Sequence, residues 1–159
     1  AVMQSIKPFL WFNDNAEGAV EFYLSVVHNA KRGVVLRPPE GAPQPPGSVM
    51  TAAFTLGDIE FVALNGGPHF QITPAISFVI PCETQAEIDD LWTRLSPGGK
   101  EMACGWLTDK FGVSWQVTPA NINELLRGKD AEGGKHAMAA MMQMVKLDIE
   151  ALKRAGGLA

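Results

Sequence analysis

One strand-then-helix pattern occurs twice in this chain, at a constant spacing. The first copy, FLWFNDNAEGAVEFYLSVV, runs from residue 9 to residue 27, and the second, FVIPCETQAEIDDLWTRLS, runs from residue 78 to residue 96. Phe9 aligns with Phe78, and Tyr23 with Trp92, so each pair is separated by 69 residues. An offset that persists through a strand, a turn and a helix indicates a duplicated supersecondary unit. We therefore expect two similar modules.

Each copy begins with an apolar strand and continues with a helix that has one apolar side. In the first module, strands are predicted at 49–55 and 59–64, and the short turn between them is typical of a β-hairpin. In the second module, strands are predicted near 102–107 and at 113–118. This gives β-α-β-β twice, and residues 31–36 fit one additional strand in the first module.

Two other segments complete the predicted organisation. Residues 38–48, PPEGAPQPPGS, must form a loop, and a long loop in a small domain often borders a site. Residues 121–155 are predicted to be helical, and Asp148 is expected to cap a last short helix. Met138, Met141 and Met142 belong to an apolar stripe there. Such methionines usually fill a helix or subunit contact, but they also suit a flexible ligand or partner.

Composition excludes several classes of protein. The 159 residues are 47% hydrophobic and 19% charged, which suits a single domain spanning 1–159. A net charge of −4 argues against nucleic acid or an anionic membrane as a partner. No apolar run approaches the roughly 20 residues that cross a bilayer. The N-terminus lacks a signal-peptide pattern, and Cys82 and Cys104 are too few for a disulfide framework, so we expect a cytoplasmic protein with free thiols.

The modules and three motifs resemble the vicinal oxygen chelate superfamily, which includes glyoxalase I, extradiol dioxygenases and bleomycin-resistance proteins. The motifs are AEGAVEFY, LNGGPHF and CGWLTDKFGVSWQVTP, and the likeness extends from about residue 6 to residue 152. Within the superfamily the chain is most similar to the PhnB-like branch, often labelled demethylubiquinone methyltransferase-like. The resemblance implies an α+β fold: two tandem βαβββ modules, at 6–65 and 75–119, form a curved mixed sheet with a cleft, and C-terminal helices follow at 121–155. It also implies a homodimer.

The resemblance further implies four inward side chains, typically His, Glu or Gln, that hold one divalent metal. In this chain the four positions fall at about Pro8, Val62, Ser77 and Gln116. Only Gln116 is a plausible ligand, and one amide with one hydroxyl falls short of the ligand set that a catalytic divalent ion needs. We therefore predict a site with no metal and no cofactor, without the metal polarisation of vicinal oxygens that the superfamily shares.

Strand alternation locates the cleft independently, because Ser114, Gln116 and Thr118 fall on one polar face of their strand. The first module contributes mainly apolar residues, and a mixed lining suits a small organic ligand. The residues predicted to line the cleft are Pro8, Leu10, Val62, Asn65, His69, Ser77, Cys104 and Gln116.

Three of these positions have alternative interpretations. Cys104 is a possible nucleophile, but a free cysteine is usually a packing residue. His69 is a candidate general base at the cleft mouth, and the simpler interpretation is a turn histidine. Asn65, with Gly66 and Gly67, most simply forms a tight turn, although glycine-rich turns also bind phosphate.

Two functions follow from these observations. The first is a metal-independent small-molecule-binding protein of the bleomycin-resistance type. The alternative is an enzyme, either a lyase, isomerase or dioxygenase of the superfamily or the methyltransferase of the branch label. A conventional S-adenosylmethionine enzyme needs a glycine-rich turn between a parallel strand and a helix, and no GxGxG-like run exists here.

Overall fold

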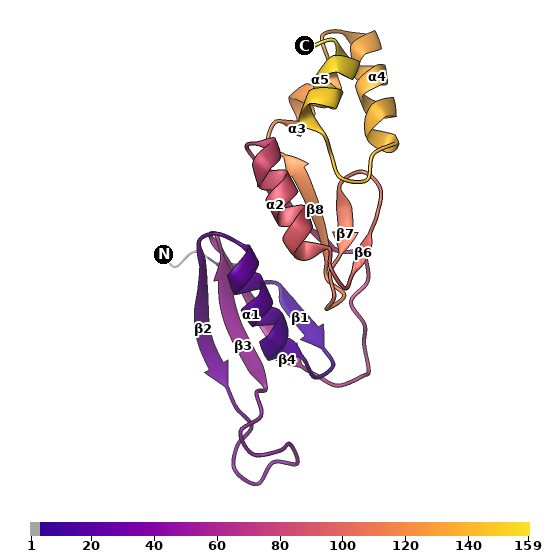
Figure 1. Ribbon diagram of the computed structural model, residues 1–159. Coiled ribbons are helices and arrows are strands. Elements are labelled where there is room, and N and C mark those ends of the chain that lie inside the picture. Colours follow the sequence, from indigo (N-terminus) through magenta and orange to yellow (C-terminus); the bar gives the residue numbers. More distant parts are fainter. Residues whose placement is uncertain (1–3) are drawn as a thin grey trace. The chain divides into compact units, whose positions relative to one another are not determined.

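The computed structural model describes residues 4–159, so the first three residues of the predicted domain lie outside it. The described residues divide into two compact units, one ending at residue 72 and the other spanning 73–159. Figure 1 shows α1 lying across one face of the first sheet. The elements of the first unit are β1 (Phe9–Phe12), α1 (Ala16–Val26), β2 (Ala30–Leu36), β3 (Thr51–Leu56) and β4 (Ile59–Asn65). The strand order is β1-β4-β3-β2, with β1 parallel to β4 and the other pairs antiparallel.

The second unit repeats this arrangement and then adds three helices. Its first part contains β5 (Ser77–Cys82), α2 (Gln85–Leu95), β6 (Lys100–Glu101), β7 (Trp106–Thr108) and β8 (Ser114–Pro119). The strand order is β5-β8-β7-β6, again with the first strand parallel to the last. The additional helices are α3 (Ile122–Arg127), α4 (Ala131–Met142) and α5 (Ile149–Gly156).

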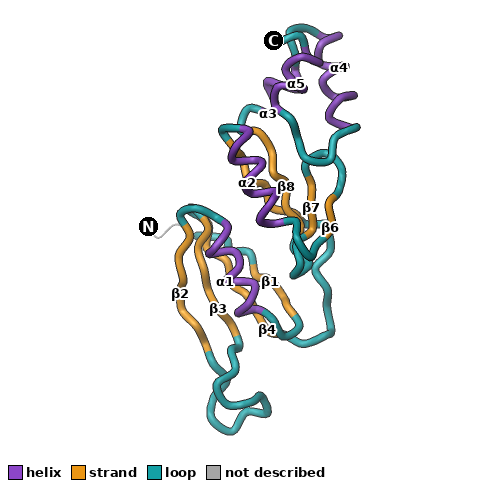
Figure 2. Tube along the Cα trace, in the orientation of Figure 1, coloured by secondary structure: helices purple, strands orange, loops and turns teal. Residues whose placement is uncertain are grey.

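The duplication predicted from the sequence is confirmed in the fold. Helices α1 and α2 have 11 residues each and begin 69 residues apart, at Ala16 and Gln85. Both units have the order β-α-β-β-β, which Figure 2 shows along the chain trace. The additional strand predicted at residues 31–36 is β2. None of the helices in residues 4–159 has the length and apolar character that crossing a bilayer requires.

The prediction of one strand over 102–107 was wrong. The short β6 ends at Glu101, before this segment, a turn follows, and β7 begins only at Trp106. Cys104 has φ +62° and Gly105 has φ +81°, both in the left-handed region that an extended strand does not use. A continuous run of apolar residues therefore concealed a turn in this part of the second module.

Aromatic side chains hold α1 on the first sheet. Tyr23 of α1 stacks on Phe54 of β3 at 6.0 Å between ring centroids, and Phe54 stacks on Phe61 of β4 at 5.2 Å. All three residues are buried. The alternation of β3 and β4 puts every second side chain under the helix, which leaves the opposite face of the sheet open.

In the second unit, a buried aspartate organises the turn before β8. Asp109 is 2% exposed. Its Oδ1 accepts hydrogen bonds from the backbone N–H groups of Phe111 (2.8 Å) and Val113 (3.1 Å), and its Oδ2 accepts one from Trp115 Nε1 (2.8 Å). The motif TDKFGVSW therefore has a structural role, because one carboxylate fixes both the turn and an indole of the core.

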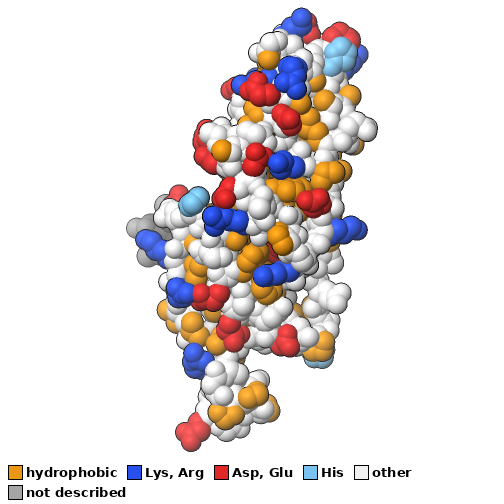
Figure 3. All heavy atoms as spheres, viewed as in Figure 1, with side chains coloured by type: hydrophobic (Ala, Val, Ile, Leu, Met, Phe, Trp, Pro, Cys, Tyr) orange, Lys and Arg blue, Asp and Glu red, His pale blue; other side chains and the backbone are white. Residues whose placement is uncertain are grey.

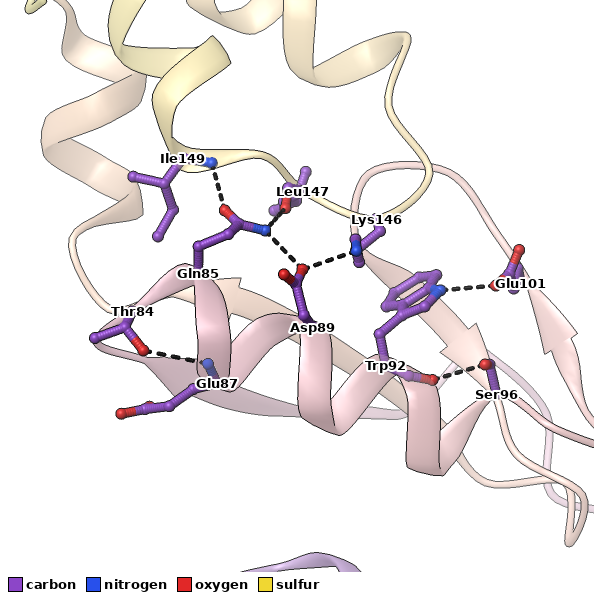
Figure 4. A network of polar contacts seen from close by, with 10 residues as sticks. All are labelled: Thr84, Gln85, Glu87, Asp89, Trp92, Ser96, Glu101, Lys146, Leu147 and Ile149. Carbon is purple, nitrogen blue, oxygen red and sulfur yellow. Dashed lines mark hydrogen bonds and ion pairs between the residues drawn. The ribbon is translucent and has the colours of Figure 1, made fainter.

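Polar contacts from α2 bind the segment between α4 and α5 (Figure 4). The Gln85 amide donates to the Leu147 carbonyl at 3.0 Å and accepts from the Ile149 N–H at 2.8 Å. Lys146 forms an ion pair with Asp89 at 2.7 Å. This ammonium, followed by the Gln85 amide, lowers the pKa of the Asp89 carboxyl. The C-terminal helices are thereby fixed to the second module.

The last helix begins as the sequence predicts. The Asp148 carboxylate accepts from the Ala151 N–H at 3.0 Å and caps α5. Close backbone packing joins the C-terminal helices, since a Cβ on Gly133 would lie 2.4 Å from the Gly156 carbonyl oxygen. Only glycine permits such an approach.

Candidate functional site

The open face of the first sheet is apolar where β1 pairs with β4, and Thr51, Thr55 and Glu60 add polar groups beside it. Phe9 and Trp11 of β1 pair with Val62 and Leu64 of β4, on the side that α1 does not cover. Phe9 is 58% exposed, a large value for an aromatic residue within a strand. Neither Phe9 nor Trp11 was among the predicted cleft residues.

Two predicted cleft residues lie at the start of β1. Pro8 precedes the strand, and its carbonyl accepts from the Val62 N–H at 3.0 Å. Leu10 is 8% exposed and pairs with the buried Ala63, on the face that α1 covers. Leu10 and Val62 therefore lie on opposite faces of the sheet. Sequence alternation was ambiguous here because β1 is apolar on both faces.

The open face of the second sheet is mixed, with polar side chains of β5, β7 and β8 beside Val79 and Trp106. Gln116 Nε2 of β8 donates to Ser77 Oγ of β5 at 2.9 Å. The hydroxyls of Thr108 and Ser114 lie 3.0 Å apart on neighbouring strands. Val79, the register partner of Gln116, is 54% exposed. The structure thus brings the predicted residues Ser77 and Gln116 together as an oriented amide–hydroxyl pair beside an apolar side chain.

Asn65, predicted to lie in a turn at the cleft, holds the start of α1. Its Oδ1 accepts from the Ala16 N–H at 2.8 Å, and its Nδ2 donates to Glu17 Oε1 at 2.6 Å and to the Val49 carbonyl at 2.9 Å. The side chain of Asn15, the residue before the helix, does not cap it. A residue 49 positions away supplies this contact, which local capping patterns cannot predict.

The LNGGPHF motif folds over Trp11. Trp11 Nε1 donates to the Gly67 carbonyl at 2.9 Å, and the Phe70 ring meets the indole edge-on at 5.0 Å. A Cβ on Gly66 would lie 2.3 Å from the indole, so this position requires glycine. His69 is exposed in the same turn. The motif therefore supports an aromatic residue of the open face.

A pocket of about 460 Å³ lies where this turn meets the start of α1 and the proline-rich loop. The loop borders a pocket, as its length suggested. Asn65 is the predicted site residue in the lining, while His69 is not part of it. The lining residues are Asn13, Asp14, Glu17, Gln44, Pro45, Ser48, Val49, Met50, Asn65, Gly66 and Gly67.

The two thiols have different surroundings. The Cys104 N–H donates to the Met144 carbonyl at 2.8 Å, and Cys104 Sγ lies 3.8 Å from Met142 Sδ. The structure thus places Cys104 against the segment that follows α4. Cys82 is buried, and burial, with a smaller contribution from the Glu87 carboxylate, raises its pKa to about 11. Cys82 is therefore an unreactive thiol at neutral pH.

The residues at the superfamily's metal positions do not fit a divalent ion. Pro8 and Val62 carry no donor side chain, and the Gln116 amide and Ser77 hydroxyl already bond to each other. Across residues 4–159, no three His, Cys, Asp or Glu side chains gather closely enough to hold a metal ion. Acidic and basic side chains are interspersed on the face that Figure 3 shows, without a basic stripe.

Two βαβββ modules, each with one helix-covered and one open sheet face, define a member of the vicinal oxygen chelate superfamily. The chain belongs to the PhnB-like branch of that superfamily: the model of the 3-demethylubiquinone-9 3-methyltransferase family matches residues 4–118. A PhnB protein from Bacillus cereus, described as a candidate 3-demethylubiquinone-9 3-methyltransferase, is 36% identical. The match covers 74% of this chain and 100% of that one, with a TM-score of 0.68.

More distant structures share the fold alone. Protein PA1353 from Pseudomonas aeruginosa is 24% identical over 74% of this chain and 98% of its own, with a TM-score of 0.57. A gene product of Arabidopsis thaliana is 19% identical over 74% and 99%, with a TM-score of 0.51. No curated protein shows significant similarity to the chain.

Proposed function

We propose that this protein binds a small organic ligand without a divalent metal, through the open faces of its two sheets. It acts as a sequestering or carrier protein of the bleomycin-resistance type, in the cytoplasm and as a homodimer. The observation that carries this proposal is the Gln116–Ser77 hydrogen bond, at two positions where the superfamily's metal ligands are expected. An amide and a hydroxyl that orient each other suit a neutral polar group of a ligand.

The open face of the first module offers an apolar binding surface of its own. Phe9 and Val62 are register partners on its open face, and the Gly66–Gly67 turn supports Trp11 beside them. An organic ligand that covers exposed aromatic surface of this kind is bound more tightly, because the covered apolar surface leaves water. An aromatic or aliphatic group of a ligand suits this face, and a neutral polar group suits the Gln116–Ser77 pair of the second module.

Methyl transfer is the alternative that the description of the Bacillus cereus relative suggests. Both strand-to-helix turns lack the glycines of a conventional S-adenosylmethionine site, since they read Asn13-Asp14-Asn15 and Glu83-Thr84. The start of each helix is also occupied by the protein itself: Asn65 binds the Ala16 N–H, and Thr84 Oγ1 accepts from the Glu87 N–H at 3.2 Å. These contacts favour a binding protein over a conventional methyltransferase.

The homodimer is supported by the free edge of the first sheet. Strand β2 is an edge strand whose Val34, Val35 and Leu36 are all exposed. Apolar side chains beside unpaired backbone groups usually meet a partner. Light scattering during size exclusion will give the mass in solution, and a monomer at micromolar concentration would contradict the dimer.

The proposed function is tested first by metal content. Protein purified without a chelating tag is offered Ni, Zn, Mn and Fe in turn, dialysed and assayed for each element. We expect no stoichiometric metal, and retention of about one ion per chain or per dimer would favour the enzyme.

Ligands are then sought by thermal shift with a panel of small organic molecules, including S-adenosylmethionine. Stabilisation by one compound, lost in Gln116→Ala and retained in the control Thr93→Ala, is the expected outcome. Thr93 is a suitable control because it is an exposed polar residue of the helix that covers the opposite face of the same sheet. Binding of S-adenosylmethionine followed by methyl transfer would overturn the proposal.

A further inference from the structure

A group of sulfur donors lies where the C-terminal segment meets the turn between β6 and β7. Cys104 belongs to the turn, Met142 is the last residue of α4, and Met138 precedes it by one helical turn. We propose that Cys104, Met138 and Met142 form a binding site for a soft monovalent metal ion, Cu(I). The residues of α4 lie outside 4–118, the part of the chain that the family shares, and the site is independent of the proposed ligand-binding faces.

The distance between the two sulfur atoms suits a shared ion. Cys104 Sγ and Met142 Sδ are 3.8 Å apart. A metal–thiolate bond of roughly 2.3 Å places two sulfurs of a three-coordinate ion about 4 Å apart. Thiolate and thioether ligands are soft donors that select Cu(I) over Mg²⁺, Ca²⁺ or Mn²⁺. A coordinating thiol is deprotonated, so binding releases the Cys104 proton to solvent.

The backbone holds the two donor segments together before any ion binds. The Cys104 N–H donates to the Met144 carbonyl at 2.8 Å, and the Gly105 N–H donates to the Val145 carbonyl at 2.7 Å. A Cβ on Gly105 would lie 2.9 Å from the Leu147 side chain, so this glycine lets the turn approach the C-terminal segment closely. Preorganised donors reduce the ordering that metal binding requires.

Helical spacing supplies the third donor. Met138 and Met142 are four residues apart and lie on the same side of α4. They are 44% and 58% exposed, so an ion can reach both thioethers. These two methionines contribute little to packing, because much of their apolar surface remains in water. Their thioethers are instead accessible to an ion from solvent.

The test is an anaerobic titration of the full chain with Cu(I) against bicinchoninate, a chromophoric competitor. We expect about one Cu(I) per chain and a thiolate-to-Cu(I) charge-transfer band in the ultraviolet. Cys104→Ser removes the band and weakens binding at least tenfold, or about 1.4 kcal/mol. The double variant M138L/M142L keeps the thiol and the apolar volume, and it weakens binding about fivefold or more.

Two controls separate the site from nonspecific sulfur binding. Cys82→Ala removes the buried thiol, and Met50→Leu removes an exposed methionine of the other unit; both retain wild-type affinity. Circular dichroism confirms that each variant is folded. The proposal is overturned if the wild type loses Cu(I) to the competitor, if C104S binds as the wild type does, or if M138L/M142L retains full affinity.

Discussion

The two modules share one topology and differ in the chemistry of their open faces. In the first module this face presents Phe9, Trp11 and Val62, while in the second it presents Ser77, Thr108 and Gln116. Both modules keep equal helices 69 residues apart and the same strand order. The fold requires only that every second residue pack under the helix. The other face is therefore free to change without loss of the fold.

The turns before the last strands differ as well. In the first module, Gly57 and Asp58 form a short exposed turn between β3 and β4. In the second, Asp109 is buried and binds Trp115 and two backbone N–H groups. In the second module the turn is thus stabilised by one buried carboxylate. In the first module an exposed turn joins two longer hairpin strands.

The largest expected effect tests this contrast between the turns. Asp109→Ala leaves an indole N–H and two backbone N–H groups without their acceptor and should lower the free energy of unfolding by about 3 kcal/mol or more. The matched variant Asp58→Ala, in the exposed turn, should change it by less than about 0.5 kcal/mol. Urea denaturation of both variants measures the difference, and equal losses would show that the two turns contribute alike.

The second largest loss in the free energy of unfolding is expected at the helix N-termini, which the two modules cap differently. Helix α1 depends on the distant Asn65, whereas α2 has the local cap Thr84. Asn65→Ala removes three hydrogen bonds and should cost about 2 kcal/mol. Thr84→Ala should cost about 1 kcal/mol. Thermal unfolding ranks the two variants, and a larger loss in T84A would contradict the tertiary cap.

Cys82 gives the second module a dependence on alkaline pH. Its pKa is raised from 9.0 to about 11 in the folded protein, so the fold favours the neutral thiol. The contribution of this thiol to the free energy of unfolding is complete below pH 9.0. It declines as pH rises towards about 11, because the thiol of the unfolded chain loses its proton first. Urea denaturation at several pH values should show this decline in the wild type and not in Cys82→Ala. A decline that persists in the variant would show that other titratable groups cause it.

The smallest effect on stability is expected on the open polar face. Gln116→Ala removes one half-exposed hydrogen bond and should cost less than about 1 kcal/mol. Its effect on ligand affinity should be larger than its effect on unfolding, because the amide is proposed to contact the ligand. Melting temperatures of the wild type and the variant, each with and without ligand, separate the effect on stability from the effect on binding. If Gln116 has only a structural role, the substitution will lower the melting temperature equally with and without ligand.

Local patterns in the sequence predicted the elements well but not the side-chain environments. Apolar periodicity located α1, α2 and β8, and the Asp148 cap is confirmed. The apolar run at 102–107 was misleading, because Cys104 and Gly105 adopt positive φ there. Alternation also left Leu10 on the same predicted surface as Val62, because a strand that is apolar on both faces carries no signal for which side the helix covers. Ser77 and Gln116 were predicted on one face, because polar residues recur at every second position of β8 and the resemblance puts both residues at the cleft.

The sequence by itself determined the duplication and the α+β class, because these depend on periodicity and spacing along the chain, and its motifs carry the resemblance to the family. Only the tertiary structure decided which residues meet across long separations. Asn65 at the start of α1, Gln85 on the segment before α5, and Cys104 against Met142 are contacts over 49, 62 and 38 residues. Such contacts arise from how helices and sheets pack, and packing depends on the whole set of apolar residues rather than on any local motif.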